Sequence, residues 1–375
     1  MSDKSFGMDL GTNSFKLYRK GKGIALHQKN IIAIKNSKEV TAYGDEAYDM
    51  YERAPESIEV AFPMLHGVIA HFQNMQSLLR MFMGDRSLKH ASVGKKDYYI
   101  AVPYNITEVE KRAFLDLVAG AGIRAKQIFM VEKPIADALG AGVPVEEARG
   151  IMVVDIGADT TEISILSLGG IVLSKLLHVG GNQLDDNICL QVKKKYNLII
   201  GRKTASRLKC MLACALKDEE SFKAPRKLQE NSKKDTKEKE SEENEETTEE
   251  SVEEVQEYPT TMTILGRDII TGLPIRKEIT FQMVYEAIEE YLLTIIDATK
   301  VILERTPPEL AADIIHSGIY LTGGSSRIHQ IDVLFHQQLD LKVNLVENPE
   351  ESVIRGLGKI MESKEYESLA SVMKL

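Results

Sequence analysis

The sequence predicts an α/β protein with two similar halves. Two copies of one pattern, an apolar run that ends in Asp-x-Gly and continues into small hydroxyl residues, occur at Asp9 and Asp155, 146 positions apart. Strand and helix candidates alternate along most of the chain, which is the order expected when helices pack on sheets. A third apolar run, residues 319–322, also ends in two glycines. Such turns let backbone N–H groups approach an anion closely, so together they predict a phosphate-binding site.

The first half contains alternating strand and helix candidates. Residues 98–102 form a strand candidate that runs through Pro103 into Thr107-Glu108-Val109-Glu110. That tetrapeptide has the capping-box pattern, which predicts the start of a helix. Residues 129–131 are the next strand candidate, and the small residues at 136–142 predict a helix that packs closely against its neighbour.

The second half repeats the arrangement after Asp155. Residues 163–165 and 171–173 alternate like two strands and are separated by Ser-Leu-Gly-Gly, so they predict a hairpin. Residues 281–305 predict a long helix, because the run ends only at Thr306-Pro307-Pro308. Prolines at that position also favour the start of a new helix at residue 309.

Composition indicates a globular protein. A chain of 375 residues with 43% hydrophobic residues can bury a large core and form more than one domain. No stretch approaches the roughly 20 apolar residues of a spanning helix, and the first residues do not resemble a secretion signal, so we expect a cytoplasmic protein. Three cysteines (Cys189, Cys210 and Cys214) are too few for a disulfide framework and lack the further ligands of a zinc site. We expect them to be buried as small hydrophobic residues.

The net charge of −9 comes from one segment. Residues 230–257 contain thirteen Asp or Glu and four Lys, and without them the chain has 43 acidic and 43 basic residues. A near-neutral body has no basic footprint for nucleic acid. The segment has too little apolar surface to fold by itself, so residues 218–258 are predicted to be a disordered insert, with a docking arm for a basic partner as the alternative.

Several stretches give the chain a specific family resemblance. It resembles the MreB family of bacterial actin homologues, in the superfamily that also contains actin, the heat-shock chaperone ATPases and the sugar kinases. The resemblance covers residues 5–217 and 259–363. Beyond the three turns, the stretches that carry it are Lys20–Ile24, Ile106–Glu110, Ser167–Ile171, Lys195–Gly201, Thr271–Pro274 and Leu303–Asp313.

The resemblance implies an actin-like fold with two lobes and a nucleotide cleft between them. Each lobe is expected to contain a mixed five-stranded sheet with flanking helices and a smaller subdomain. Lobe I is expected to span residues 1–142, with residues 340–375 returning to it, and lobe II residues 143–339. ATP and Mg²⁺ are the implied ligands, with Asp9 and Asp155 holding the metal through water.

The resemblance also implies which residues contact the nucleotide. Lys16 falls where actin has a phosphate-contacting lysine; a lysine that points to solvent from a strand is the alternative reading. The residues carried over for the two phosphate turns are Asp9, Gly11, Thr12, Asn13, Ser14, Lys16, Gly157, Ala158, Asp159 and Thr160. Those carried over for the nucleoside are Ser206, Lys209, Gly323, Gly324, Ser325, Ser326 and Arg327.

Two residues depart from the family pattern in the catalytic part of the cleft. The family has two glycines where this chain has Ala158 and Asp159, and a glutamate that positions the attacking water where this chain has Lys133. An ammonium group has no lone pair with which to orient water, so Lys133 marks a degenerate catalytic position. Thr161 is the other catalytic candidate. We hypothesise that Lys133 pairs with Asp159 and guards the γ-phosphate site; the alternative is that Lys133 binds the γ-phosphate directly.

The function implied by the resemblance is that of a filament-forming cytoskeletal protein. Filaments of this family lie on the inner face of the cytoplasmic membrane, determine rod shape and guide the cell-wall elongation machinery. ATP hydrolysis in this chain is expected to be slow or lost. The alternative is a nucleotide-insensitive scaffold that co-assembles with an active paralogue. A chaperone is disfavoured because the resemblance leaves no substrate-binding domain, and a sugar kinase because Lys133 replaces a carboxylate. Residues 84–96, where relatives insert into membrane, are expected to be an ordinary surface loop.

Overall fold

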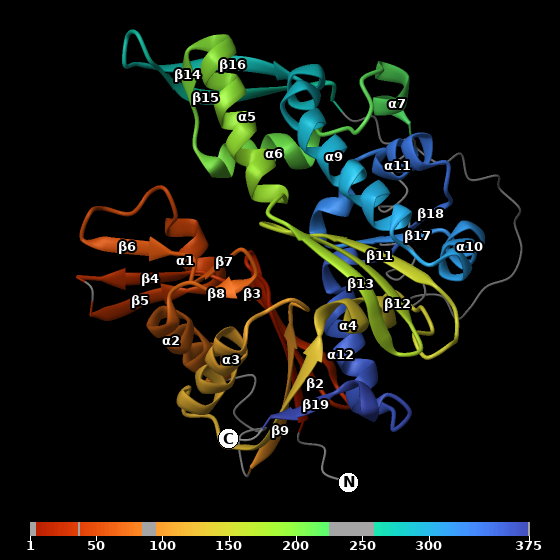
Figure 1. Ribbon diagram of the computed structural model, residues 1–375. Helices are drawn as coiled ribbons and strands as arrows, with labels where there is room; N and C mark the ends of the chain where they lie inside the picture. The colour runs from red at the N-terminus through yellow and green to blue at the C-terminus, as the bar shows by residue number, and fades with distance from the viewer. Residues whose placement is uncertain (1–4, 37, 85–94, 225–258, 374–375) are drawn as a thin grey trace, which may run out of the picture.

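Two large sheets form the two halves of the molecule (Figure 1). The computed structural model describes residues 5–36, 38–84, 95–224 and 259–373. Most of the predicted insert and of the predicted loop at residues 84–96 therefore lies outside the described residues. Within the described ranges, no helix is both long enough and apolar enough to cross a bilayer.

The first sheet has the strand order β19-β10-β9-β1-β2-β3. Its central strand, β1, pairs in parallel with β9 and antiparallel with β2. One strand more than expected is present, because β19 near the end of the described chain pairs with β10. The strands are β1 (Ser5–Leu10), β2 (Ser14–Arg19), β3 (Gly23–Lys29), β9 (Lys96–Val102), β10 (Ala125–Glu132) and β19 (Ser371–Met373).

The second sheet repeats this topology with the order β13-β12-β11-β17-β18. Its strands are β11 (Ile151–Ile156), β12 (Thr161–Ser167), β13 (Gly170–Leu177), β17 (Ile319–Thr322) and β18 (Val343–Leu345). The predicted hairpin is confirmed as β12 and β13. Equivalent registers place Lys16 opposite Asp9 and Glu162 opposite Asp155. The equivalent aspartates of the two halves therefore have different cross-strand neighbours, a lysine in the first sheet and a glutamate in the second.

Two helices cross between the sheets, α4 (Lys133–Gly140) and α12 (Ser352–Glu362). The prediction of a closely packed helix near residues 136–142 is confirmed. A β-carbon on Gly140 would overlap the carbonyl oxygen of Ser352, and one on Gly356 would overlap that of Ala136. Glycine at both positions lets the two backbones approach. This crossing fixes the start of α4, where Lys133 lies, against the second sheet.

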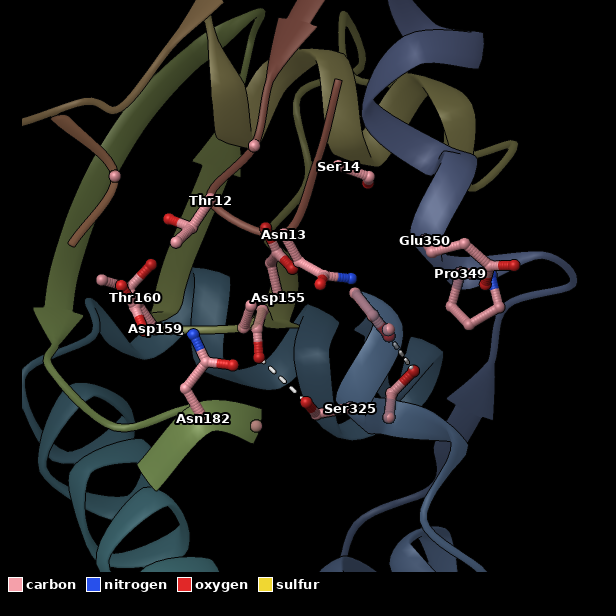
Figure 2. Close-up of a pocket in the computed structure, with 18 of the residues that line it drawn as sticks. Thr12, Asn13, Ser14, Asp155, Asp159, Thr160, Asn182, Ser325, Pro349 and Glu350 are labelled. Carbon is pink, nitrogen blue, oxygen red and sulfur yellow. Dashed lines mark hydrogen bonds between the residues drawn. The ribbon is translucent and has the colours of Figure 1, made fainter. Parts of the chain in front are cut away.

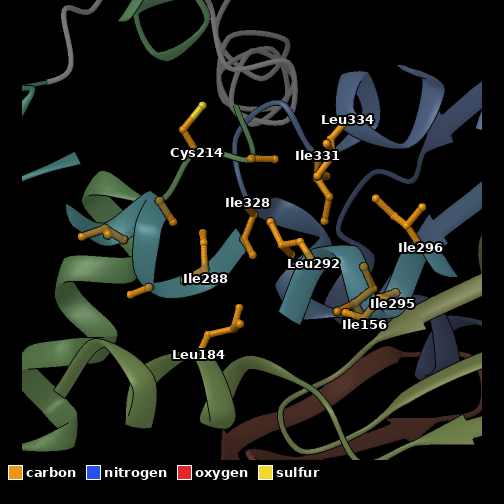
Figure 3. Close-up of a cluster of buried hydrophobic side chains, with 14 of the residues drawn as sticks. Ile156, Leu184, Cys214, Ile288, Leu292, Ile295, Ile296, Ile328, Ile331 and Leu334 are labelled. Atoms are coloured by element: carbon orange, nitrogen blue, oxygen red, sulfur yellow. The ribbon is translucent and has the colours of Figure 1, made fainter. Parts of the chain in front are cut away.

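The long helix α9 (Phe281–Glu304) organises the largest hydrophobic core (Figure 3). Ile288, Leu292 and Ile295 of α9 are buried together with Ile156 of β11 and Ile328. The predicted helix end and restart are confirmed, because α10 (Pro308–Ser317) follows directly. The capping box is also confirmed at Thr107, which precedes α3 (Glu108–Gly120).

Part of the predicted insert is folded. Residues 219–223 form the short helix α7 (Glu219–Lys223), although the insert was predicted to begin at residue 218. Phe222 is completely buried and stacks on Phe281 with 4.4 Å between ring centroids. The apolar Phe222 side chain orders this turn by packing on α9, whereas the acidic residues from 230 onward have no comparable apolar surface.

A small subdomain extends from each half (Figure 1). One contains β4 (Ile32–Lys35), β5 (Glu39–Tyr43), β6 (Ile58–Ala61) and α1 (Gly44–Met50), whereas β7 (Met64–Leu65), β8 (Val68–Ile69) and α2 (Phe72–Met83) pack on the core of the first sheet. The other contains β14 (Leu198–Ile199), β15 (Thr261–Asp268), β16 (Pro274–Thr280), α5 (Gly181–Tyr196) and α6 (Arg202–Leu212). Helix α11 (Ile331–Leu339) packs beside α9.

Burial of the cysteines is predicted correctly only for Cys214. Cys189 is half-buried, and Cys210 is exposed. The prediction is wrong for Cys210 because α6 buries the face that carries Ala205, Leu208 and Leu212, and Cys210 lies on the side that faces the cleft.

Candidate functional site

A cleft of about 770 Å³ opens where β1, β11 and β17 end (Figure 2). It is lined by the three glycine turns, by the first turns of α4 and α5, and by α6. Every residue predicted to contact nucleotide or metal lines this cleft, as does Lys133. Thr161 is the exception. Adjacent strand residues point to opposite faces, so Glu162 faces the cleft while the Thr161 hydroxyl donates to the carbonyl of Val179 at 2.8 Å.

The first turn contains Gly11, a position with no room for a β-carbon. A β-carbon on Gly11 would lie 2.9 Å from the Ser14 carbonyl oxygen. The Asn30 side chain donates to the Gly11 carbonyl at 2.8 Å, and Lys29 donates to the Asn13 side chain at 3.1 Å. These contacts hold the backbone of the turn against the cleft.

The second turn has the same geometry in spite of its two altered residues. A β-carbon on Gly157 would lie 2.9 Å from the Thr160 carbonyl oxygen, as in the first turn. Neither Ala158 nor Asp159 has a positive φ, so the change from glycine at these positions brings no backbone strain. Ser325 donates to the Gly157 carbonyl at 2.9 Å and ties the third turn to the second.

The predicted pairing of Lys133 with Asp159 is wrong. The Lys133 ammonium lies 2.6 Å from Oδ2 of Asp155. Val153 and Asp155 share one face of β11 because strand residues alternate, and α4 packs on that face. Lys133 is the first residue of α4 and so meets Asp155. Glu132, at the end of β10, is absent from the cleft lining and lies near Lys111 instead.

Asp159 is held by neutral donors from both halves of the molecule. Its Oδ1 accepts a hydrogen bond from the Asn182 side chain at 2.6 Å, and its Oδ2 accepts one from the His66 backbone N–H at 3.1 Å. The residue is only 5% exposed. Its carboxylate therefore places a fixed negative charge in the turn expected to face the terminal phosphate.

Replacing Asp159 by asparagine is expected to raise the affinity for ATP about tenfold more than the affinity for ADP. The change removes one charge beside the position of the third phosphate and keeps the shape of the side chain, and a factor of ten needs only about 1.4 kcal/mol of relieved repulsion. Titration calorimetry with both nucleotides measures the ratio. Asp186→Asn is the matched control, because Asp186 is 47% exposed and its pair with Arg202 lies at the rim. An unchanged ratio in Asp159→Asn contradicts the prediction.

Lys16 is not the solvent-facing lysine of the alternative reading. It is 5% exposed, and its ammonium donates to Oδ2 of Asp9 at 2.8 Å. The pair follows from the antiparallel register of β1 and β2, which sets the two residues side by side.

Two further buried acids were not predicted: Glu162 lines the cleft, and Asp137 lies outside the cleft lining, in a small cavity that it shares with Lys133 and Asp155. Burial raises the pKa of Glu162 to about 7, although the nearby Lys133 and the Tyr104 N–H oppose this rise. Burial and the neighbouring Asp155 raise the pKa of Asp137 to about 8. Thr322 donates to Asp137 at 2.5 Å, and Ser352 donates to its other oxygen. Asp137 thus joins α4, β17 and the start of α12.

Stability is expected to fall as the pH rises from about 4 to about 8. The folded protein keeps the Asp137 proton up to a pKa of about 8, whereas the unfolded chain loses it near 3.8, so the folded state binds more protons in this window. Asp137→Asn removes this contribution, since an amide does not titrate. Thermal unfolding of both proteins at pH 5 and pH 8 measures it. If Tm changes between pH 5 and pH 8 by the same amount in the wild type and in Asp137→Asn, the prediction is contradicted.

The nucleoside side of the cleft already contains internal ion pairs. Lys209 lies 2.8 Å from Asp185 and donates to the Gly181 carbonyl at 2.6 Å. Arg327, expected to stack on the base, forms two hydrogen bonds of 2.9 Å with Glu350. Ser206 also lines the cleft, three residues before Lys209 on α6. The residues expected to contact the nucleoside therefore lie together in the cleft. Lys209 and Arg327, however, form ion pairs with Asp185 and Glu350 of the protein itself.

The start of α5 was missed from the sequence, although its glycine pair is a usable signal. A β-carbon on Gly180 would lie 2.7 Å from the Ala158 carbonyl, and one on Gly181 would lie 2.7 Å from the Ser325 hydroxyl oxygen. Two adjacent glycines after a strand predict a fourth close approach of backbone to the same site. They bring Asn182 to Asp159.

The expected magnesium ligands do not fit a metal site in this arrangement. Asp9 and Asp155 each hold a lysine ammonium at 2.8 Å and 2.6 Å. Among the residues described, no group of three or more His, Cys, Asp or Glu side chains is placed to hold a metal ion. One oxygen of each carboxylate, Oδ2, is therefore engaged by a cation of the protein itself.

Known proteins match both the sequence and the fold. Residues 3–257 and 236–368 match the family described as MreB/Mbl protein. The cell shape-determining protein Mbl of Bacillus cereus is 35% identical over 364 residues, which cover 97% of each chain. The cell shape-determining protein MreB of Escherichia coli is 33% identical, covering 96% of this chain and 94% of that protein.

Solved structures agree. A crystal structure of MreB 5 of Spiroplasma citri bound to AMPPNP superposes with a TM-score of 0.81 and 28% identity, covering 97% of each chain. The paired sheets, their repeated topology and the sequence matches lead to one conclusion: this chain belongs to the MreB/Mbl family of cell shape-determining actin homologues.

Proposed function

We propose that the chain binds a nucleotide in the cleft and assembles into filaments, and that it hydrolyses ATP slowly or not at all. Three glycine turns and the start of α5 bring backbone groups to one cleft. The similar structures of MreB 5 of S. citri are described as bound to AMPPNP and to ADP. These observations support an adenine nucleotide as the ligand, with Gly11, Gly157 and Ser325 at its phosphates.

One observation carries the proposal of slow hydrolysis, the pair of Lys133 with Asp155. A residue that positions or deprotonates water needs a lone pair, and a protonated lysine has none. Besides Asp155, the carboxylates of Asp9 and Glu162 act on Lys133, and Oε1 of Glu162 accepts a hydrogen bond from the Tyr104 N–H at 3.2 Å. Lys133, the side chain at the expected catalytic position, is therefore not equipped to act as a base.

Filament formation is supported by family membership. The matching relatives are described as cell shape-determining proteins. We propose self-association of the two-lobed unit, with residues 1–142 and 143–339 as the lobes. Contact with the cytoplasmic membrane, with the cell-wall elongation machinery and with an MreB paralogue are further parts of the proposal.

A nucleotide-insensitive scaffold is the second candidate. It is favoured by the ion pairs of Lys209 with Asp185 and of Arg327 with Glu350, because a nucleotide would have to compete with these acids for the same cations. In that case the chain would assemble in the same way whether or not the cleft is filled.

Negative-stain microscopy of the full chain, without nucleotide, with ADP and with ATP, distinguishes the two candidates when combined with titration calorimetry. Filaments that depend on nucleotide, with measurable binding, support the proposed function. Filaments under all conditions without binding support the scaffold. Binding without filaments under any condition contradicts self-association.

A further inference from the structure

The two aspartates that end equivalent strands have equivalent partners. Asp9 at the end of β1 and Asp155 at the end of β11 each hold a lysine ammonium, at 2.8 Å and 2.6 Å. Their side chains are 7% and 9% exposed, so both carboxylates are almost fully removed from solvent. Buried carboxylates need a cation, and here that cation comes from the chain.

The backbone positions of both lysines are constrained. Lys16 is fixed by strand pairing, because it lies directly opposite Asp9, and its side chain is 6% exposed. Lys133 is fixed by the close crossing of α4 with α12, which permits no shift of the α4 backbone toward Gly356. Its side chain is 23% exposed, on the side that lines the cleft. Both ammonium groups therefore lie at the floor of the cleft, beside their aspartates.

We propose that Lys16 and Lys133 take the place of a divalent cation, so that this cleft binds nucleotide phosphates without Mg²⁺. The inference rests on the proposed nucleotide binding. Two ammonium groups supply the same charge as one Mg²⁺ ion, and they occupy the carboxylates that would hold it.

The chemistry of the ammonium group suits this role. Each lysine ammonium has three N–H donors and donates one to its aspartate. The remaining donors can bind phosphate oxygens in the cleft. Hydrogen bonds between an ammonium and a phosphate are charge-assisted and short. A metal entering the same site would instead leave Lys16 and Lys133 buried beside a dication without their partners, which is strongly unfavourable.

The backbone turns complete the site. Gly11 and Gly157 leave no side chain between the turns and the floor of the cleft, so phosphate oxygens can reach both the N–H groups of the turns and the ammonium groups beneath them. Asp159 adds a negative charge at the far end of the second turn. This arrangement matches a nucleoside diphosphate better than a triphosphate.

Metal dependence of ADP binding by the full chain tests the inference. Calorimetry in excess MgCl₂ and in excess EDTA should give dissociation constants that agree within about threefold for the wild type. Lys16→Met removes one ammonium and keeps a chain of similar length, so its affinity in EDTA should fall at least about tenfold and should be restored by Mg²⁺. Lys209→Met, at the nucleoside side, is the matched control and should weaken binding equally in both conditions.

The outcomes are distinct. Wild-type binding that needs Mg²⁺ overturns the inference while leaving the proposed function intact. Absence of ADP binding in both conditions overturns the proposed function and the inference with it. A second measurement uses no variant: the electron paramagnetic resonance signal of Mn²⁺ should be unchanged by the wild-type protein with ADP beyond the effect of ADP alone. A protein-dependent change in that signal overturns the inference.

Discussion

Changing Lys133 to glutamate together with Asp159 to glycine is expected to raise the rate of ATP hydrolysis about 100-fold. A positioned general base contributes about 10² to 10⁴ to a rate, and the lower value applies because the new carboxylate lies among Asp155, Asp9 and Glu162. Asp159→Gly removes one of the negative charges around the third phosphate. With Lys133 gone, Asp155 regains a free carboxylate, so the variant should also require Mg²⁺. Phosphate release under saturating ATP measures the rate.

The matched control is Lys133→Gln with Asp159→Gly. It removes the same charges but adds no base, so hydrolysis should stay near the wild-type rate. A wild-type rate already equal to that of the glutamate variant would show that Lys133 does not limit hydrolysis. Melting curves of all three proteins should accompany the assay, since the glutamate is introduced beside a buried carboxylate.

Gly356→Ala is expected to lower the free energy of unfolding by about 2 kcal/mol. The added β-carbon would overlap the carbonyl oxygen of Ala136 on α4, and backbone atoms on both sides leave no flexible group to move. Overpacking of this kind costs about 1 to 3 kcal/mol or more, and the gain in helix propensity of about 1 kcal/mol offsets only part of it. Chemical denaturation measures the change.

Gly120→Ala is the control for that experiment. Gly120 is also helical, at the end of α3, but its β-carbon would meet only the terminal amide of Gln76, a flexible side chain. Its effect on stability should be within about 1 kcal/mol of zero. Similar losses in the two variants would mean that the crossing of α4 and α12 is not the cause.

Much of the cleft could be predicted because its turns are local patterns. Gly11, Gly157 and Gly323 stand at strand ends, and a strand end with glycine is visible in any sequence. The hairpin after Asp155 and the helix that crosses α12 were predicted in the same way, from patterns of neighbouring residues. The nucleotide candidates carried over from the family resemblance all line one cleft, whereas Thr161, a catalytic candidate, does not.

The partners of the charged residues could not be predicted, because they depend on packing between distant segments. Lys133 meets Asp155 rather than Asp159 only because α4 covers one particular face of β11. Asp159 is held by His66 and Asn182, which lie 93 and 23 residues away in the chain. The fold of α7 depended on a single aromatic residue, Phe222, at the edge of an acidic segment. The alternation of side chains along a strand is predictable from the sequence. Applied to this strand, it places Thr161 and Glu162 on opposite faces, so only one of them can face the cleft.

The two lysine pairs differ in what they connect. Lys16 and Asp9 belong to neighbouring strands of one sheet, so their separation is constant when the halves of the molecule move. Lys133 starts a helix that follows the first sheet, whereas Asp155 ends a strand of the second. A rotation between the halves that carried α4 with the first sheet would change the second distance and leave the first unchanged. In such a rotation Lys16 would keep its distance to Asp9, whereas the distance between Lys133 and Asp155 would change with the angle between the lobes.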